Sequence, residues 1–244
     1  MRTKKPHLFF LYQWIVVFPI LFVITAFVAL ATMILSPLLP NSELSYYPAR
    51  WWARVTCKLC FVRVRIFGFK YLDPQQSYVF ALNHQSIFDI FVVYGWLPYI
   101  FQWLMKAELR RIPLIGKACE AAGHIFINRS NPVEAKRSLE RAEAQLKNGV
   151  SLVVFPEGTR TYTGEMGKFK RGAFRIASDL LLPIVPVTIK GSYECLHRNT
   201  ANVTPGVIEV YIHKPIDLNF VEPDRIPELM QKTWDMIHND LQSR

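Results

Sequence analysis

Cysteine is scarce in this sequence, and its spacing argues against a structural metal site. Cys57 and Cys60 form one CxxC pair, while Cys119 and Cys195 stand alone. No second Cys or His pair accompanies them at metal-ligand spacing, so a zinc site is not expected. The interpretation that remains is four reduced thiols in a protein that faces the cytoplasm.

Acidic residues are also in short supply. The chain has 19 Asp and Glu against 29 Lys and Arg, a formal net charge of +10. This balance predicts an anionic partner, which is a nucleic acid, an anionic membrane or a phosphorylated substrate. Internal repeats, low-complexity tracts and domain linkers are absent. A chain of 244 residues with 51% hydrophobic content therefore indicates one sizeable domain with an appendage.

Charged residues are missing altogether between Leu8 and Ser42. The run from Leu8 to Leu35 is nearly continuous in apolar residues and exceeds the roughly 20 that cross a bilayer. A secretory signal has an apolar core of only about 7 to 15 residues and ends at small residues. Here SPLLPNSEL follows the run, so we expect a retained membrane anchor.

The topology of this anchor is left open by the sequence. Basic residues flank the apolar run on both sides, so the positive-inside rule gives little bias. Pro19 lies in the middle, where it is expected to kink or break a helix. A single tilted span and a bent insertion into one leaflet are both compatible with the pattern.

The segment after the apolar run alternates aromatic and basic residues. Trp51 and Trp52 stand among Arg50, Arg54 and Lys58 at helical spacing, which is typical of a helix at the headgroup level of an anionic membrane. An ordinary surface helix packed through its Trp face is the alternative. We expect residues 1–60 to form the membrane-anchoring helical segment and residues 61–244 to form the folded domain.

From Phe61 onward, strand and helix patterns alternate. This order predicts a single α/β sandwich domain around a central, mostly buried sheet. The expected strands begin with the alternating run from Phe61 and continue at Tyr78–Leu82, Tyr99–Leu104, His124–Ile127, Ser151–Phe155, Ile184–Ile189 and Val207–Ile212. A capped helix is expected from Asn131 to Gly149. An apolar stripe near the C-terminus predicts a core-facing helix and comprises Met230, Trp234, Ile237 and Leu241.

Two polar stretches follow expected strands. NHQSIFD, residues 83–89, comes directly after Tyr78–Leu82, and its His84 and Asp89 are five positions apart. Alone, this spacing does not separate a turn from a catalytic device. The second stretch, PEGTRTYTGEMGKFKRG, follows the strand ending at Phe155. Its cations and glycines suit a phosphate bound close to the main chain at the carboxyl end of a strand, where α/β folds place their sites.

Together these stretches resemble the glycerolipid acyltransferases, and most closely their 1-acyl-sn-glycerol-3-phosphate acyltransferase branch. NHQSIFD is similar to the family's N-H-x4-D signature and FPEGTR to its F-P-E-G-T-R signature. KAELRRIPLIGKACEAAGHIFINR, residues 106–129, and LLPIVPVTI, residues 181–189, resemble two further blocks. Four blocks in order over roughly residues 50–215 make a specific signal, whereas a lone His-x4-Asp is common by chance.

The resemblance implies a general-base mechanism. His84 would take the proton of an attacking hydroxyl, since imidazole has an ordinary pKa of about 6.5. Asp89 would fix the tautomer and stabilise the imidazolium, provided that a helix begins near Ser86 and places Asp89 in its first turn. The chain lacks a GxSxG nucleophile elbow, so we expect direct attack by the substrate hydroxyl without an acyl-enzyme.

The resemblance also implies the substrate-binding residues. Lys106 and Arg160 are the expected ligands of a lysophosphatidate phosphate, and Glu157 is expected to bind glycerol or order Arg160. Gly158 and Thr159 complete that block, and Arg129 and Arg171 are additional candidates. The oxyanion donors are expected among backbone amides of the glycine-rich loop.

The predicted reaction is acyl transfer from acyl carrier protein or coenzyme A to the sn-2 hydroxyl of 1-acylglycerol-3-phosphate, which gives phosphatidic acid. No metal or redox cofactor is implied. The expected partners are lysophosphatidic acid, the acyl thioester and an anionic membrane, with the catalytic domain on the cytoplasmic face. The alternatives are another lysolipid or glycerol-3-phosphate as acceptor, a lipid hydrolase, and a non-catalytic binder of anionic lipid or nucleic acid.

Overall fold

The N-terminal apolar run forms one long helical rod. The computed structural model describes residues 7–128, 138, 140, 146, 150–218 and 225–243. The rod consists of α1 (His7–Tyr12), a π-helical turn η1 (Gln13–Val17) and α2 (Phe18–Leu38). Pro19 does not break it, because Pro19 lies in the first turn of α2 and the wider π turn precedes it. A π turn changes the backbone hydrogen-bond spacing, which accommodates the missing proline N–H.

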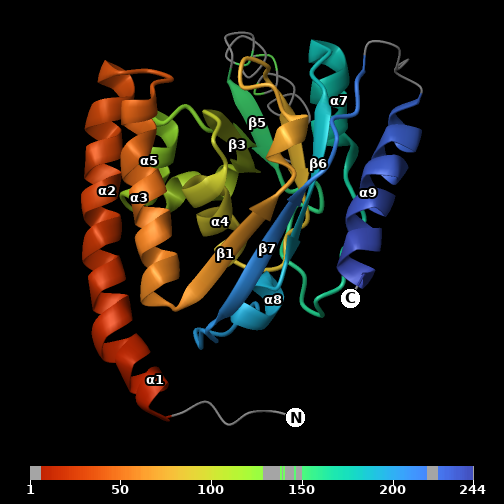
Figure 1. The fold of residues 1–244 in the computed structure, drawn as a ribbon. Coiled ribbons are helices and arrows are strands. Elements are labelled where there is room, and N and C mark those ends of the chain that lie inside the picture. The colour runs from red at the N-terminus through yellow and green to blue at the C-terminus, as the bar shows by residue number, and fades with distance from the viewer. Residues whose placement is uncertain are drawn as a thin grey trace.

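The second helix, α3 (Glu43–Leu59), returns antiparallel beside α2 (Figure 1). Ser42 caps its N-terminus by accepting a hydrogen bond from Ser45 N at 3.1 Å. Its two tryptophans point in different directions. Trp51 is 41% exposed, whereas Trp52 packs edge-on against Phe91 and donates to Thr25 Oγ1 at 2.9 Å. Trp52 therefore joins α3 to both α2 and the folded domain.

A seven-stranded sheet forms the centre of the domain, in the order β1-β7-β6-β2-β5-β3-β4. Neighbouring strands are parallel except for the antiparallel pair β6 and β7. The strands are β1 (Val62–Phe67), β2 (Val79–Leu82), β3 (Phe101–Lys106), β4 (Ile125–Ile127), β5 (Ser151–Val154), β6 (Ile184–Lys190) and β7 (Gly206–Ile212). Each predicted strand is confirmed, with ends shifted by at most two residues.

Helices cover both faces of this sheet (Figure 1). The first face carries α3 and α4 (Phe88–Trp96), and the second carries α7 (Arg171–Leu180) and α9 (Ile226–Gln242). The short elements are η2 (Phe69–Tyr71), η3 (Ala107–Arg111), α5 (Ile115–Ala121) and α8 (Ser192–Cys195). The predicted α/β sandwich is confirmed. The C-terminal stripe faces the core, as Ile237 is fully buried. The helix expected from Asn131 to Gly149 lies largely outside the described residues.

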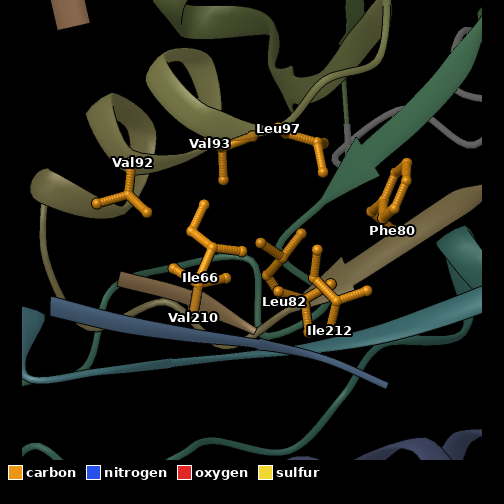
Figure 2. Close-up of a pocket in the computed structure, with 9 residues that line it drawn as sticks. Ile66, Phe80, Leu82, Val92, Val93, Leu97, Val210 and Ile212 are labelled. Atoms are coloured by element: carbon orange, nitrogen blue, oxygen red, sulfur yellow. The ribbon is translucent and has the colours of Figure 1, made fainter. Parts of the chain in front are cut away.

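The core beneath α4 is nearly filled with apolar side chains (Figure 2). Val92 and Val93 of α4, and Leu97 just after its end, face Ile66, Leu82 and Ile212 of the sheet across a cavity of about 10 Å³. A cavity of this size holds at most about one water molecule. Tyr46 and Cys57 of α3 belong to the same apolar cluster, so the N-terminal helical segment and the domain share one core. The division at residue 60 stays a prediction.

Candidate active site

The parallel strands bring the two polar stretches to one edge of the sheet. Strands β2 and β5 are direct neighbours, with Ala81 opposite Val154, and His84 and Glu157 follow their carboxyl ends. Strand β3 is next to β5 and ends at Lys106. Lys106 therefore lies at the same edge of the sheet, on the strand that follows β5 in the order β2-β5-β3.

His84 and Asp89 form a hydrogen-bonded pair at this edge. The distance from His84 Nδ1 to Asp89 Oδ2 is 2.8 Å, and the His84 side chain is 13% exposed while that of Asp89 is fully buried. A carboxylate on Nδ1 leaves Nε2 as the basic nitrogen. Within the described part of the chain, Nε2 has no hydrogen-bond partner. The pair therefore has the geometry of a general base and its orienting acid.

The turn that joins β2 to α4 explains the five-residue spacing. Helix α4 begins at Phe88, so Asp89 lies in its first turn. From there Oδ2 also accepts the backbone N–H groups of Gln85 at 2.7 Å and Ser86 at 2.8 Å. These two amides hold the Asp89 carboxyl in place beneath the His84 ring. The predicted helix start near Ser86 is confirmed to within two residues.

The Glu157 carboxyl joins the turn that carries His84 to the glycine-rich stretch that follows β5. Its Oε1 accepts His84 N at 2.6 Å and its Oε2 accepts Gly167 N at 2.7 Å. Only 6% of the residue is exposed, and burial raises the pKa of its carboxyl to about 7, although both backbone hydrogen bonds act in the opposite direction. In the described structure this carboxylate binds main-chain amides rather than the Arg160 side chain. Substrate contact by Glu157 stays a prediction.

Phe155 forms the wall behind the imidazole. The rings of His84 and Phe155 are stacked, with centroids 3.8 Å apart and an interplanar angle of 9°. Trp103 of β3 stacks against Phe155 in turn, at 5.3 Å. Phe155 therefore fixes the plane of the imidazole.

Asn83 has a structural role, as its position in a turn suggests. Its amide donates to Ile189 O at 2.8 Å and accepts from Ile189 N at 2.7 Å. The side chain thus continues the pairing of β2 with β6 beyond Leu82, and it is fully buried. Ser86 fastens the same turn by donating to Leu196 O at 2.8 Å.

The glycine-rich stretch forms an arm, residues 157–169, that closes on itself beside His84. Lys170 N donates to Pro156 O at 2.9 Å, so the two ends of the arm meet. Thr161 N donates to His84 O at 3.1 Å, which places neighbouring Arg160 next to the imidazole-bearing turn. Gly158 adopts a φ of 75°, a conformation that favours glycine.

The predicted cations line this edge with different degrees of exposure. Arg160 is half-buried, whereas Lys106, the last residue of β3, and Arg171, the first residue of α7, are exposed. Lys168 and Lys170 are exposed on the arm and just after it. Arg129 lies outside the described residues. The structure thus brings Lys106, Glu157, Gly158, Thr159 and Arg160 to the edge that carries His84.

Sequence reasoning missed a segment that touches both halves of the site, residues 192–203. Its Arg198 donates from Nη1 to Arg160 O at 2.6 Å and to Thr159 Oγ1 at 3.0 Å. Its Tyr193 donates to Tyr162 O at 2.9 Å. No motif signals these contacts, because they join residues more than 30 positions apart.

The cysteines lie apart from this chemistry. All four are free, and Cys57, Cys60 and Cys195 are buried. Burial raises the pKa of the Cys195 thiol to about 11 and keeps it protonated. Among the described residues, no group of three or more His, Cys, Asp or Glu side chains is placed to hold a metal ion.

Comparison with protein families gives a match over the middle of the chain. The model described as Acyltransferase matches residues 63–190, a range that includes His84, Asp89 and the whole arm. Among solved structures, the crystal structure of the 1-acyl-sn-glycerophosphate (LPA) acyltransferase PlsC from Thermotoga maritima has a TM-score of 0.75 and 25% identity. That match covers 95% of this chain and 92% of the other.

Curated relatives carry consistent names. The 1-acyl-sn-glycerol-3-phosphate acyltransferase of Cocos nucifera is 35% identical over 176 residues, which is 72% of this chain and 55% of that protein. The alpha enzyme of Homo sapiens is 34% identical over 172 residues, 70% of this chain and 61% of that protein. The enzyme of Saccharomyces cerevisiae is 32% identical over 219 residues, 88% of this chain and 72% of that protein. The chain thus spans less than two thirds of the first two relatives.

Proposed function

The chain belongs to the acyltransferase family, and from this premise we propose that it acylates the sn-2 hydroxyl of 1-acylglycerol-3-phosphate and so makes phosphatidic acid. The relatives' names support this choice of acceptor. The donor in this proposal is an acyl thioester of acyl carrier protein or coenzyme A. The observation that carries the proposal is the His84–Asp89 pair, 2.8 Å apart, beside an arm rich in cations.

His84 acts as the general base in this reaction. As the substrate oxygen attacks the thioester carbonyl, its proton moves to His84 Nε2, and Asp89 stabilises the imidazolium through Nδ1–H. The resulting tetrahedral intermediate breaks its C–S bond and expels the thiolate. The imidazolium then returns the proton to that sulfur. Phe155, stacked at 3.8 Å, keeps the ring in one plane during both transfers.

The arm supplies the site for the substrate phosphate. The backbone of Arg160 lies beside His84, because the next residue, Thr161, donates from its N–H to His84 O. A guanidinium can bind a phosphate through two parallel hydrogen bonds. Lys106, the last residue of β3, adds a second positive charge at the same edge of the sheet. A phosphate held between them leaves the neighbouring glycerol hydroxyl near His84.

The long apolar helix suits a membrane-borne substrate. The stretch Leu8–Leu38 has 31 residues, a mean hydropathy of 2.7 and little burial, which is enough to cross a membrane by length and composition. Its exposed face carries Phe22, Val23, Phe27 and Ile34, each more than 60% exposed. We propose that this helix holds the enzyme at the membrane, with the catalytic domain on the cytoplasmic side where the thioester is available.

Acceptor selection tests this function. The purified full-length chain, in mixed micelles, is given labelled acyl-coenzyme A or acyl carrier protein with lysophosphatidate, lysophosphatidylcholine or glycerol-3-phosphate. We expect label in phosphatidate with lysophosphatidate, and none with His84→Ala. Faster labelling of another acceptor would overturn the choice of substrate. Release of free fatty acid without any acceptor would instead indicate a hydrolase.

A further inference from the structure

Arg198 lies outside the residues that the family model matches, yet it makes three contacts with the arm. Its Nη1 donates to Arg160 O at 2.6 Å and to Thr159 Oγ1 at 3.0 Å. Its guanidinium also covers the ring of Tyr162, with Cζ 3.9 Å from the centroid. These contacts involve Thr159, Arg160 and Tyr162. Arg198 therefore holds the chain just before, at and just after the residue that is proposed to bind the phosphate.

The arm needs such support because its own sequence gives it little rigidity. It contains three glycines and many exposed residues, and glycine has the largest backbone entropy to lose on ordering. Glu157 holds it at Gly167, and Gln85 donates to Gly164 O at 2.6 Å. Between Glu157 and Gly164, Thr161 N donates to His84 O at 3.1 Å. On either side of Thr161, Arg160 and Tyr162 are held by residues 193 and 198.

The same segment is fixed to the catalytic turn. Ser86 Oγ donates to Leu196 O at 2.8 Å, only two residues before Arg198. Tyr193 also packs against Gly164, where an added Cβ would lie 3.0 Å from the ring. Residues 192–198 therefore connect the turn that carries His84 with the arm that carries Arg160.

We propose that Arg198 is a positioning residue that sets the distance between the phosphate-binding Arg160 and the His84 base. The proposal rests on the function proposed above. A planar guanidinium can donate two hydrogen bonds and stack on a ring at once, whereas an ammonium cannot reproduce that geometry. Loss of Arg198 leaves His84 and Asp89 paired but lets the arm move. Lysophosphatidate then loses affinity more than the chemical step loses rate.

The test compares Arg198→Ala, Arg198→Lys and a matched control, Arg175→Ala. Arg175 is an exposed residue of α7 that forms an ion pair with Asp179 at 3.6 Å. Three properties are measured in the full-length protein: the rate of tryptic cleavage at Lys168 and Lys170, the KM for each substrate, and the Tm. Because cleavage follows the population of open conformations, it reports the arm without relying on activity.

We expect Arg198→Ala to speed cleavage at Lys168 and raise the KM for lysophosphatidate, each about tenfold. The KM for the acyl donor and the Tm should match wild type. Arg198→Lys should give a cleavage rate and a KM for lysophosphatidate between those of wild type and Arg198→Ala. Arg175→Ala should leave the cleavage rate, both KM values and the Tm at their wild-type values.

Two results would overturn the proposal. A raised KM with unchanged cleavage would mean that Arg198 touches the phosphate itself and does not position the arm. Unchanged cleavage together with an unchanged KM in both Arg198 variants would mean that the contacts have no functional consequence. Failure of the wild-type protein to acylate lysophosphatidate would refute the proposed function instead, and the cleavage rates would still report whether Arg198 holds the arm.

Discussion

At the scale of single residues, the site works by restricting one imidazole. Asp89 determines which nitrogen carries the proton, and Phe155 covers one face of the ring. Glu157 and Thr161 hold the His84 backbone from opposite sides, at N and at O. A base that is already held in one orientation loses little entropy when the substrate binds. Little of the activation barrier then comes from orienting the base.

The first prediction concerns Asp89→Asn. An amide does not stabilise the imidazolium and permits the wrong tautomer, so kcat should fall by about 10² to 10⁴ with little change in KM. Initial rates at saturating lysophosphatidate and thioester measure the effect. Asp179→Asn, which alters an exposed carboxylate on α7, is the control and should behave as wild type. A kcat for Asp89→Asn within about threefold of wild type would show that the pair is not catalytic.

The second prediction concerns pH and Glu157. Burial raises the pKa of this carboxyl from 4.5 to about 7, so the folded protein keeps a proton that the unfolded chain has already released. Between these values the free energy of unfolding should fall as pH rises, by up to about 1.4 kcal/mol per pH unit. Glu157→Gln should lack this slope. Denaturant unfolding in detergent from pH 4.5 to 8 measures it, and parallel curves for both proteins would contradict the assignment.

At the scale of elements, the sequence predicted those strands and helices that depend on the pattern of neighbouring residues. The central strands β2, β5 and β6 follow from apolar runs, because a sheet covered on both faces buries both sides of its strands. The edge strand β1 follows instead from alternating apolar and basic residues. The pairing of His84 with Asp89 was implied by the family resemblance, and the succession of strand, turn and helix brings the two side chains together. The π turn before Pro19 was not predicted, because it depends on how the backbone adjusts over a whole helical turn.

Long-range polar contacts were beyond a sequence-based prediction. Gln13 shows why: its Nε2 donates to Ala201 O, and its Oε1 accepts Val203 N at 2.9 Å, across almost 190 positions. A lone Gln within an apolar run carries no sign of its partner. The contacts of Arg198 are likewise not visible in the sequence. The Glu157 side chain points inward because it accepts from His84 N and Gly167 N, and these two amides come together only when the chain folds.

The third prediction tests how Gln13 fastens the apolar helix. Gln13 is 1% exposed, and Gln13→Leu removes its hydrogen bonds to Ala201 and Val203. A buried hydrogen bond contributes about 0.5–1.5 kcal/mol, so the Tm in detergent should fall by several degrees. Ile15→Ala, at a residue 68% exposed in the same turn, is the control. Equal Tm values for Gln13→Leu and Ile15→Ala would show that this contact contributes nothing.

At the scale of the whole molecule, the apolar helix and the catalytic edge meet at one end. Gln13 contacts residues 201–203, Arg198 contacts the arm, and Ser86 contacts Leu196, so one segment touches helix, arm and catalytic turn. This arrangement suits the proposal that one substrate comes from a membrane and the other from water. The net charge of +10 favours association with an anionic lipid surface.

The fourth prediction concerns membrane binding. Phe22 and Phe27 are 78% and 66% exposed on α2. Lysine near the middle of a membrane helix costs about 2.5–3.5 kcal/mol, so the double variant Phe22→Lys/Phe27→Lys should float poorly with vesicles that contain phosphatidylglycerol. Arg175→Ala provides the control. Flotation of the double variant equal to wild type would contradict insertion of this face.

The central claim is that His84 activates the acceptor hydroxyl directly. The decisive measurement is the rate at which labelled acyl thioester enters phosphatidate, with wild type and His84→Ala at saturating lysophosphatidate, together with the label left on the protein when the acceptor is omitted. The account predicts a loss of about 10² to 10⁴ for the variant and no acylated protein. Turnover of His84→Ala near the wild-type rate, or a stable acyl-enzyme that passes its label to lysophosphatidate, would contradict it.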